Sequence, residues 1–409
     1  MGQTRGQTAH VIGLGRSGAA AARLLHHQGY GVTLSDRNPT PHFQALQTEL
    51  TTEGIRVQLG HAYDPDQDQA DQIVVSPGVP WDIPALKLAR DRGLSVIGEM
   101  ELAWRALGDR PWVGITGTNG KTTTTALTAA LFQAAGFHAP ACGNIGDAAC
   151  ELALTAPKPD WIIAELSSYQ IESAQTLCPR IGLWTTLTPD HLARHYTLEN
   201  YANIKAQLLE ASELQILNGD DPYLREQGDR FPQAHWTSIH GRQALPARTA
   251  TAYLNDGWVY VNDQKIVEAT TLRMVGAHNQ QNLLMAVAAA HFAGIEADVI
   301  QAAIANFPGV PHRLEYICTW QGIDFINDSK ATNYDAAEVG LSAVSAPVIL
   351  IAGGDPKDGD DTAWLREIQQ KAAAVVLIGD AAASFQARLQ TVGYTQTEIV
   401  KTLDQAIPQ

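Results

Sequence analysis

A short run of small residues with one lysine, from Gly114 to Thr122, stands between an apolar segment and an alanine-rich segment. Its sequence, GITGTNGKT, fits a loop whose backbone N–H groups turn inward. Together with the positive end of a following helix, such N–H groups hold the anionic oxygens of a phosphate chain. Lys121 would add a mobile positive charge, and the Thr122 hydroxyl would ligate Mg²⁺. The segment therefore predicts binding of a nucleoside triphosphate.

This loop departs by one residue from the generic pattern G-x-x-x-x-G-K-[ST], because Ile115 stands where that pattern has its first glycine. The alternative is a glycine turn that only caps a helix, with Lys121 exposed to solvent. The apolar strand before the loop and the helix after it favour phosphate binding. The residues that we expect to contact ATP here are Gly117, Thr118, Asn119, Gly120, Lys121, Thr122 and Thr123.

Two polar positions follow other apolar, strand-like segments of the same region. Glu165 comes after WIIA, and the pair Asp190-His191 comes after WTTLT. Because the carboxyl ends of parallel strands meet at one edge of a sheet, we expect Glu165 and His191 to lie near the phosphate loop. Carboxylate oxygens are ligands that Mg²⁺ prefers. The alternatives are that Glu165 caps a helix or pairs with a cation, and that His191 is structural.

A second glycine-rich turn, Gly13 to Gly18, has the spacing G-x-G-x-x-G after a strand-like segment, and Asp36 ends the next such segment. These features favour a dinucleotide and hence an NAD(P)-dependent dehydrogenase. The same geometry suits any nucleotide diphosphate, however, because it offers only backbone N–H groups and a helix end. A tight turn without a ligand is a third alternative.

The elements that must position these residues form an α/β pattern throughout the 409-residue chain. Apolar strands alternate with helix-like segments, which predicts mainly parallel sheets with flanking helices. At roughly 150 residues per domain we expect three domains. Turn residues place their borders near Gly108–Pro111 and near residue 311, which gives a Rossmann-like domain over 1–109, a P-loop-type domain over 110–311 and a Rossmann-like domain over 312–409. An antiparallel hairpin is expected within 251–269, a helix over 281–293 closing at Gly294, and a helix end at Gly136.

Composition excludes several classes of partner. A formal net charge of −15 would repel phosphate backbones, so no nucleic acid or anionic membrane surface is expected. The sequence shows no secretory leader and no apolar run near the roughly 18 residues of a membrane span, so we expect a cytoplasmic protein. The four cysteines have no C-x-x-C spacing and stand in apolar segments, which predicts reduced thiols in the core.

The phosphate loop T-G-T-N-G-K-T (116–122) resembles the variant found in the Mur ligase family and in folylpolyglutamate synthetases. Further motifs extend this resemblance over essentially the whole chain. They are ELSSYQ (165–170), Asp190-His191, the Y-x-x-x-K spacing of Tyr201 and Lys205, NIG (144–146), GAHNQQN (276–282), His312-Arg313, NDSKATN (327–333) and Lys357 in GGDPK.

The resemblance implies roles for residues that the pattern alone leaves open. Lys205, which by itself would be a helix-surface lysine, would carry a carbamate and ligate one of two Mg²⁺ ions with Thr122, Glu165 and His191. Lys121, Glu165, His191 and Lys205 would be the catalytic residues. Further ATP contacts would be Asn279, Asn282, Arg313 and Asp328. A UDP-linked substrate would meet Gly15, Arg16, Ser17, Asp36, Arg37, Ser76, Pro77, Gly78 and Asn144. D-glutamate would meet Lys330, Thr332 and Lys357, which would otherwise be solvated loop residues.

The activity implied by the resemblance is ATP-dependent ligation of D-glutamate to UDP-N-acetylmuramoyl-L-alanine through an acyl phosphate, in peptidoglycan precursor synthesis, by a monomer. The first domain would bind the UDP part, the second ATP and the third the amino acid. Family members usually continue past this point with an S-P-A-x-A-S-F-D-like segment, so we expect the third domain to be truncated at Gln409. The alternatives are another amino-acid ligase of the superfamily, a dehydrogenase, and a regulatory nucleotide-binding module without chemistry.

Overall fold

The computed structural model describes residues 6–356 and 359–407, and these form two compact units. The first unit contains the chain up to Leu187 together with His191–Thr271 and Gln281–Asn306. The second contains Thr188–Asp190, Leu272–Gln280 and the chain from Phe307 onward. The α/β class expected from the sequence is confirmed in both units.

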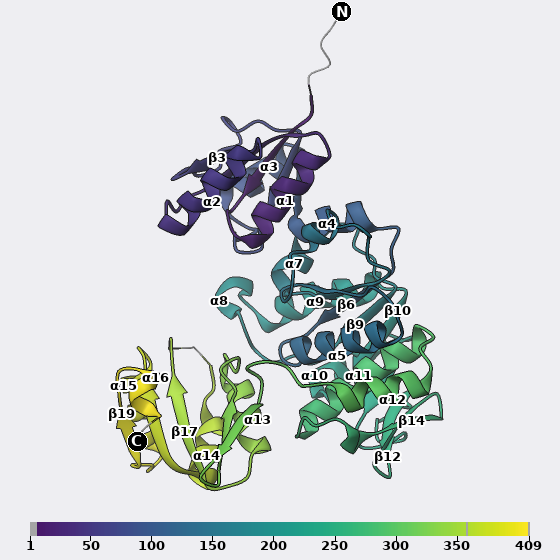
Figure 1. The fold of residues 1–409 in the computed structure, drawn as a ribbon, viewed down its shortest axis with the longest axis vertical. Helices are drawn as coiled ribbons and strands as arrows, with labels where there is room; N and C mark the ends of the chain where they lie inside the picture. Colours follow the sequence, from purple (N-terminus) through teal and green to yellow (C-terminus); the bar gives the residue numbers. More distant parts are fainter. Residues whose placement is uncertain (1–5, 357–358, 408–409) are drawn as a thin grey trace, which may run out of the picture. The chain divides into compact units, whose positions relative to one another are not determined.

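The N-terminal part of the first unit is a parallel sheet flanked by helices, as the alternation of apolar and helical segments predicted (Figure 1). Its strand order is β3-β2-β1-β4-β5. Val11, Leu34 and Val74 from three of its strands are completely buried, because side chains on both faces of a parallel sheet are covered. The elements are β1 (Thr8–Ile12), α1 (Arg16–His27), β2 (Gly31–Asp36), α2 (Pro41–Thr52), β3 (Arg56–Leu59), β4 (Gln72–Val75), α3 (Pro84–Asp91), β5 (Ser95–Gly98) and α4 (Glu99–Leu107).

The central part of the first unit has a nine-stranded sheet in the order β14-β13-β12-β11-β10-β9-β6-β8-β7. Its strands are β6 (Trp112–Thr116), β7 (Ala141–Gly143), β8 (Ile162–Glu165), β9 (Ile181–Trp184), β10 (Leu214–Asn218), β11 (His235–Ser238), β12 (Ala252–Asn255), β13 (Trp258–Val261) and β14 (Gln264–Glu268). Strands β6 to β12 pair in parallel, while β12, β13 and β14 are antiparallel, which confirms the hairpin expected within 251–269.

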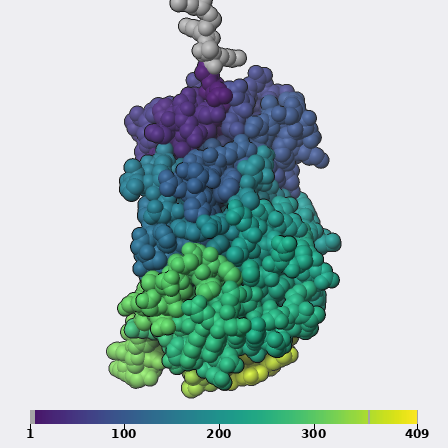
Figure 2. Space-filling model, turned by 90° about the vertical axis from the view of Figure 1, so that its right-hand side faces the viewer, coloured from purple at the N-terminus to yellow at the C-terminus, as the bar shows by residue number. Residues whose placement is uncertain are grey.

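Helices connect these central strands. They are α5 (Lys121–Ala134), α6 (Ala149–Leu152), α7 (Ser168–Glu172), α8 (Leu192–His195), α9 (Leu198–Ala211), α10 (Pro222–Glu226), α11 (Ala277–Phe292) and α12 (Ala297–Asn306), with 3-10 turns at Gly228–Arg230 and Ala269–Thr271. Gly136 and Gly294 have the left-handed backbone predicted at helix ends, with φ of 88° and 83°. Helix α1 packs on α4 and α6. In Figure 2 the purple and blue surface of the N-terminal part is continuous with the teal surface of the central part.

The second unit holds a parallel three-stranded sheet and a separate antiparallel hairpin. Leu341, Trp364, Ile368 and Leu377 form the centre of its core. The segment IDFIN (323–327) forms a strand that pairs with the preceding strand in this hairpin and not with the parallel sheet. The elements are β15 (Glu315–Trp320), β16 (Ile323–Asn327), α13 (Tyr334–Ala343), β17 (Val348–Gly353), α14 (Thr362–Lys371), β18 (Ala372–Ile378), α15 (Ala382–Thr391), β19 (Thr397–Ile399) and α16 (Leu403–Ala406).

The cysteines follow the sequence prediction only in part. All four are free thiols, and Cys142 and Cys150 are buried, where burial raises the pKa of both. Cys178 and Cys318 are exposed, so their assignment to the core was wrong. Apolar neighbours in the sequence did not indicate burial of Cys318, because this residue lies on β15, a hairpin strand whose residues are mostly exposed. Over the described residues, no helix is both long and apolar enough to span a bilayer.

Candidate functional site

The phosphate loop connects the buried strand β6 to the start of α5, as its sequence predicted. Gly117 and Gly120 both have left-handed backbone, with φ of 150° and 83°. A Cβ atom on Gly117 would lie 1.9 Å from Thr185 Oγ1, and one on Gly120 would lie 2.5 Å from Asn282 Oδ1. Both positions therefore require glycine for conformation and for space.

The end of the next strand holds the loop in shape. Asn119 N donates to Thr186 Oγ1 at 2.9 Å, and Thr118 N donates to the Thr186 carbonyl at 2.9 Å. Lys121 Nζ donates to the carbonyls of Gly117 and Thr118 at 2.8 and 2.7 Å, so its ammonium group lies over the loop. The threonines of WTTLT were overlooked in the sequence, although a polar strand end beside a glycine loop was a usable signal.

Substituting Gly117 by alanine should weaken ATP binding. The new methyl group would collide with Thr185 and Thr186, which costs on the order of 1 to 3 kcal/mol and corresponds to roughly 5- to 150-fold in affinity. Isothermal titration with an ATP analogue measures this loss. Gly29→Ala is the matched control, because Gly29 also has left-handed backbone but open space around its Cβ position. Equal ATP affinity in Gly117→Ala and Gly29→Ala would contradict the steric account.

Glu165 lies at the end of β8, beside the phosphate loop, because β8 pairs with β6 so that Ile115 faces Glu165. Only 1% of the residue is exposed. Its Oε1 accepts a hydrogen bond from Asn144 Nδ2 at 2.7 Å, while its Oε2 has no hydrogen-bond partner in the part of the chain that the structure describes. A buried carboxylate oxygen without a donor is costly unless a cation faces it. This residue therefore fits a cation site.

Lys205 is almost completely buried, contrary to the surface position that its helical pattern alone indicated. Its Nζ donates to the Gly117 carbonyl at 2.8 Å and to Thr116 Oγ1 at 3.3 Å. The same nitrogen lies 4.6 Å from the centre of the Tyr201 ring. Helix α9 therefore directs this side chain at the base of the phosphate loop.

His191 immediately precedes α8 and has left-handed backbone with φ of 55°. Its ring lies 5.4 Å from that of Tyr169 and 6.5 Å from that of Tyr201, both of which flank the Glu165 and Lys205 region. Among the described residues, no cluster of three or more His, Cys, Asp and Glu side chains could enclose a metal by itself. Mg²⁺ needs no such cage, because one or two carboxylates together with substrate phosphates hold it.

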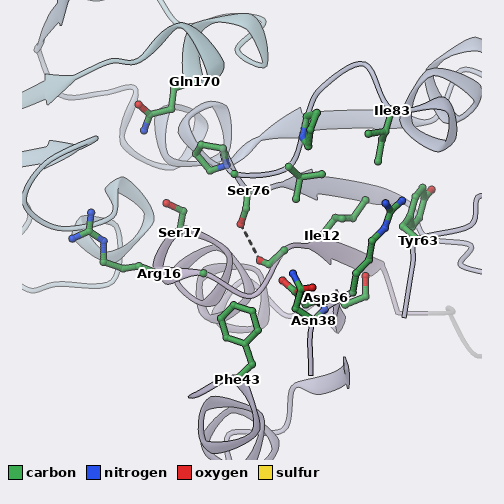
Figure 3. Close-up of a pocket in the computed structure, with 18 of the residues that line it drawn as sticks. Ile12, Arg16, Ser17, Asp36, Asn38, Phe43, Tyr63, Ser76, Ile83 and Gln170 are labelled. Carbon is green, nitrogen blue, oxygen red and sulfur yellow. Dashed lines mark hydrogen bonds between the residues drawn. The ribbon is translucent and has the colours of Figure 1, made fainter. Parts of the chain in front are cut away.

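A cavity of about 550 Å³ lies at the carboxyl ends of the N-terminal strands, where the order changes direction between β1 and β4. Such switch points bind ligands in open α/β sheets. All nine residues predicted for the UDP-linked substrate line it: Gly15, Arg16, Ser17, Asp36, Arg37, Ser76, Pro77, Gly78 and Asn144. Figure 3 shows Arg16 and Gln170 at one end and Tyr63 and Ile83 at the other. The cavity lining also includes Asn38, Phe43, His61, Tyr63 and Gln170, which sequence reasoning missed.

Asp36 shapes the glycine turn of this cavity. Its carboxylate accepts hydrogen bonds from the backbone N–H of Leu14 and of Asn38, each at 2.8 Å. Ser76 Oγ donates to the Gly13 carbonyl at 2.9 Å (Figure 3). A Cβ on Gly18 would come within 1.9 Å of that carbonyl, so glycine permits the close packing of α1. The glycine spacing is therefore explained by packing as well as by a ligand.

His10 lies behind the cavity, almost completely buried, with its Nε2 2.8 Å from Ser35 Oγ. Burial lowers its pKa from 6.5 to about 4. Because the folded pKa is depressed, the neutral ring stabilises the fold above pH 6.5 and this contribution is lost as the pH falls toward 4. We expect about 2 to 3 kcal/mol of unfolding free energy to be lost this way. Urea unfolding at pH 7 and 4.5 should show that the free energy of unfolding changes less with pH in His10→Gln than in the unaltered chain. An equal change in both would contradict this role of His10.

Asn282 belongs to the phosphate-loop region, since its Oδ1 accepts from Thr124 Oγ1 at 3.2 Å. The remaining candidates lie in the second unit. Asn279 is buried and donates to the Val275 carbonyl at 2.7 Å. Asp328 accepts from Leu314 N at 3.1 Å, and burial raises its pKa. Arg313 is half-buried, Lys330 and Thr332 are exposed, and Lys357 lies outside the described residues.

Comparisons with known proteins place the chain in a family. A Mur ligase middle domain matches residues 115–290, a MurD-like N-terminal Mur ligase domain matches 7–98, and a Mur ligase glutamate ligase domain matches 312–409. A relative from Trichormus variabilis named UDP-N-acetylmuramoylalanine--D-glutamate ligase is 63% identical over 406 residues, which is 98% of this chain and 89% of the relative. The chain belongs to the Mur ligase family. A ligase of the same name from Synechocystis is 58% identical over 97% of this chain and 89% of its own length.

Solved Mur ligases share the fold. MurC from Thermotoga maritima has a TM-score of 0.62 at 18% identity and covers 98% of this chain and 92% of its own. MurF from Acinetobacter baumannii has a TM-score of 0.63 at 16% identity, with 97% and 85% covered. Membership of the Mur ligase family makes this chain an ATP-dependent amino-acid ligase and removes the dehydrogenase alternative, although the turn at Gly13 matched its fingerprint.

Proposed function

We propose that this Mur ligase joins D-glutamate to UDP-N-acetylmuramoyl-L-alanine with cleavage of ATP to ADP and phosphate. The observation that carries the proposal is the Asn144–Glu165 hydrogen bond of 2.7 Å. Asn144 lines the substrate cavity, and Glu165 lies on the strand beside the phosphate loop. One contact thus connects a nucleotide-type cavity to a phosphate site, which is what phosphoryl transfer between two substrates requires. The names of the relatives supply the amino acid and the acceptor.

The proposed ligation has two steps. The terminal carboxylate of the UDP substrate attacks the γ-phosphorus of ATP, forming an acyl phosphate and releasing ADP. The D-glutamate amine then attacks the acyl carbon, phosphate leaves, and the amine loses a proton as the amide forms. Both steps depend on positioning and charge neutralisation more than on a covalent nucleophile of the protein.

Each part of the site has a task in these steps. The amides of the loop 117–122 and the N-terminal end of α5 bind the phosphate oxygens, and Lys121 neutralises the charge that develops on the transferred group. Two Mg²⁺ ions would supply charge neutralisation and orientation of the phosphates, held by Glu165, Thr122 and His191. Gly15, Arg16 and Ser17 at the start of α1 would hold the UDP diphosphate.

We also propose that Lys205 carries a carbamate formed with CO₂ and contributes its oxygens to the second cation. Its burial beneath the phosphate loop supports this role, because a carbamate converts an ammonium into an oxygen ligand where phosphate and metal meet. With ¹³C-labelled bicarbonate, the protein should show a carbamate resonance that is missing in Lys205→Arg, and that variant should lose turnover on the order of 10²-fold. Full activity of Lys205→Arg would contradict the proposal. Lys265→Arg, an exposed lysine over the Trp258 ring, is the control.

The roles of the remaining candidates and domains belong to the same proposal. Residues 1–109 would bind the UDP substrate, 110–311 ATP and 312–409 the amino acid. Lys330, Thr332 and Lys357 would bind D-glutamate, since two cations suit a dicarboxylate. Asn279, Arg313 and Asp328 would contact ATP. We propose a monomer in the cytoplasm, where ATP and UDP-linked sugars are made.

Phosphate release tests the proposed function. With ATP, Mg²⁺ and UDP-N-acetylmuramoyl-L-alanine, phosphate should appear when D-glutamate is added, but not with L-glutamate, L-alanine or meso-diaminopimelate. Mass spectrometry of the product should show the added glutamyl group. Faster turnover with another amino acid would assign the chain to a different ligase of the superfamily, and ATP binding without phosphate release would indicate a regulatory module.

A further inference from the structure

A cluster of charged and polar side chains that the proposed reaction does not use lies between the substrate cavity and the segment that bears His191. Arg194 of α8 is its centre: Nη2 lies 2.7 Å from Glu172 Oε2, and Nη1 lies 3.6 Å from Asp82 Oδ2. Tyr196 Oη donates to the same Asp82 oxygen at 2.9 Å. We call Asp82, Glu172, Arg194 and Tyr196 the arginine cluster.

The arginine cluster is partly shielded from water, so its charges interact more strongly than surface pairs do. The Arg194 and Glu172 side chains are 15% and 19% exposed, whereas Asp82 is 43% exposed. Burial raises the pKa of Glu172, and Arg194 opposes this rise. Removing one partner from such a shielded pair leaves the other charge poorly solvated, and the contact therefore holds its elements together.

One member of the arginine cluster, Asp82, lies in a segment that lines the cavity. Asp82 stands in the segment 76–83 that follows β4, and that segment supplies a large share of the cavity lining. Its lining members are Ser76, Pro77, Gly78, Val79, Pro80 and Ile83. A ligand that orders this segment therefore also fixes the carboxylate to which Arg194 and Tyr196 are bound.

Two other members, Arg194 and Tyr196, lie in the segment that bears His191. Helix α8 is a single turn between two residues with left-handed backbone, His191 at φ 55° and Tyr196 at φ 66°. Such backbone is unfavourable for side chains of this size, and persists only where surrounding contacts impose it. Those contacts are Arg194 and Tyr196 toward Asp82, and His195 Nε2 at 2.9 Å from Ser168 Oγ of α7.

We propose that the arginine cluster positions α8, and with it His191, according to whether the cavity is occupied, so that a nucleoside diphosphate in the cavity and Mg²⁺–ATP at the phosphate loop strengthen each other's binding. Arg194 and Tyr196 are positioning residues in this account, because neither touches a reacting atom. The inference rests on the proposed function and adds a coupling between its two sites. Coupling between two ligands is reciprocal, so either one reports it.

The experiment uses UDP as the cavity probe and a non-hydrolysable ATP analogue with Mg²⁺ as the second ligand. Titration calorimetry on the full chain gives the Kd of UDP with and without the analogue. We expect the analogue to lower the Kd of UDP about 5-fold or more in the unaltered chain. In Tyr196→Phe and in Arg194→Met, the ratio of the Kd of UDP without the analogue to that with it should fall to about 1. The Kd of UDP alone should be little changed. Tyr196→Phe removes one hydroxyl from an exposed ring, so it keeps the test valid if Arg194→Met fails to fold.

The chain contains a matched control at a distance in sequence. Tyr253 Oη of β12 donates to Asp263 Oδ1 at 2.8 Å, and Arg242 Nη2 lies 3.0 Å from Asp263 Oδ2, which repeats the tyrosine–aspartate–arginine arrangement with the aspartate in the β13–β14 turn. Tyr253→Phe should leave the coupling ratio unaltered. An unaltered ratio in Tyr196→Phe, or no coupling in the unaltered chain, would overturn the inference while both ligands still bind. Failure of the chain to bind either ligand would instead overturn the proposed function.

Discussion

Lys121→Ala is expected to lower turnover on the order of 10²- to 10³-fold, the largest single effect that the site predicts. The ammonium group lies over the phosphate loop, bonded to the carbonyls of Gly117 and Thr118, so it is already in place when phosphate arrives. A charge positioned in this way stabilises the transferring phosphoryl group more than the ground state, and its loss should reduce kcat.

Steady-state phosphate release measures this effect, with kcat separated from KM for ATP. Lys87→Ala is the control, because Lys87 is an exposed lysine on α3. The thermal unfolding midpoint of Lys121→Ala should stay close to that of the unaltered chain, since Lys121 Nζ bonds to carbonyls of its own loop, three and four residues before it. Turnover of Lys121→Ala equal to that of Lys87→Ala would remove the lysine from the mechanism.

Glu165→Gln is expected to lower turnover by about 10²-fold and to raise the Mg²⁺ concentration needed for half-maximal rate. Glutamine keeps the oxygen that accepts from Asn144 but loses the negative charge of the buried oxygen that has no donor in the described structure. The charge, rather than the shape, is therefore what the substitution tests.

Glu101→Gln separates this effect from general damage to the fold. Glu101 is also buried, but its carboxylate accepts from Thr176 and Gln175 and pairs with Arg105. Its substitution should lower the unfolding midpoint and leave the Mg²⁺ dependence of the rate unaltered. A Glu165→Gln enzyme that needs no more Mg²⁺ than Glu101→Gln would exclude Glu165 as a cation ligand.

The strands and the phosphate loop were predictable because local sequence determines them. The short apolar runs of β1, β6 and β8 are bounded by turn residues, which favours buried strands, and Gly117 and Gly120 stand where the backbone takes positive φ. The glycine turn at Gly13, Asp36 and the turn 76–78 gather at the cavity because parallel strands bring their carboxyl ends to one edge, whereas Asn144 after β7 and Phe43 of α2 reach the cavity from other elements.

Burial and long-range pairing were not predictable from local pattern. Lys205 looked like a surface lysine because helix periodicity carries no information about the Gly117 carbonyl, 88 residues away, that accepts its hydrogen bond. The contact between Tyr196 and Asp82 spans 114 residues, so no window of sequence contains it. The antiparallel pairing of β15 with β16 and the exposure of Cys318 likewise depend on which surfaces the fold leaves uncovered.

A crystal structure of the protein with Mg²⁺ and a non-hydrolysable ATP analogue would show whether the loop 117–122 binds the triphosphate. We expect the β- and γ-phosphates to lie on the backbone N–H groups of residues 117–122, with Lys121 Nζ turned toward them and a cation facing Glu165 Oε2. Triphosphate density at the Gly13–Gly18 turn, with the Lys121 loop left unchanged and without ligand, would contradict this expectation.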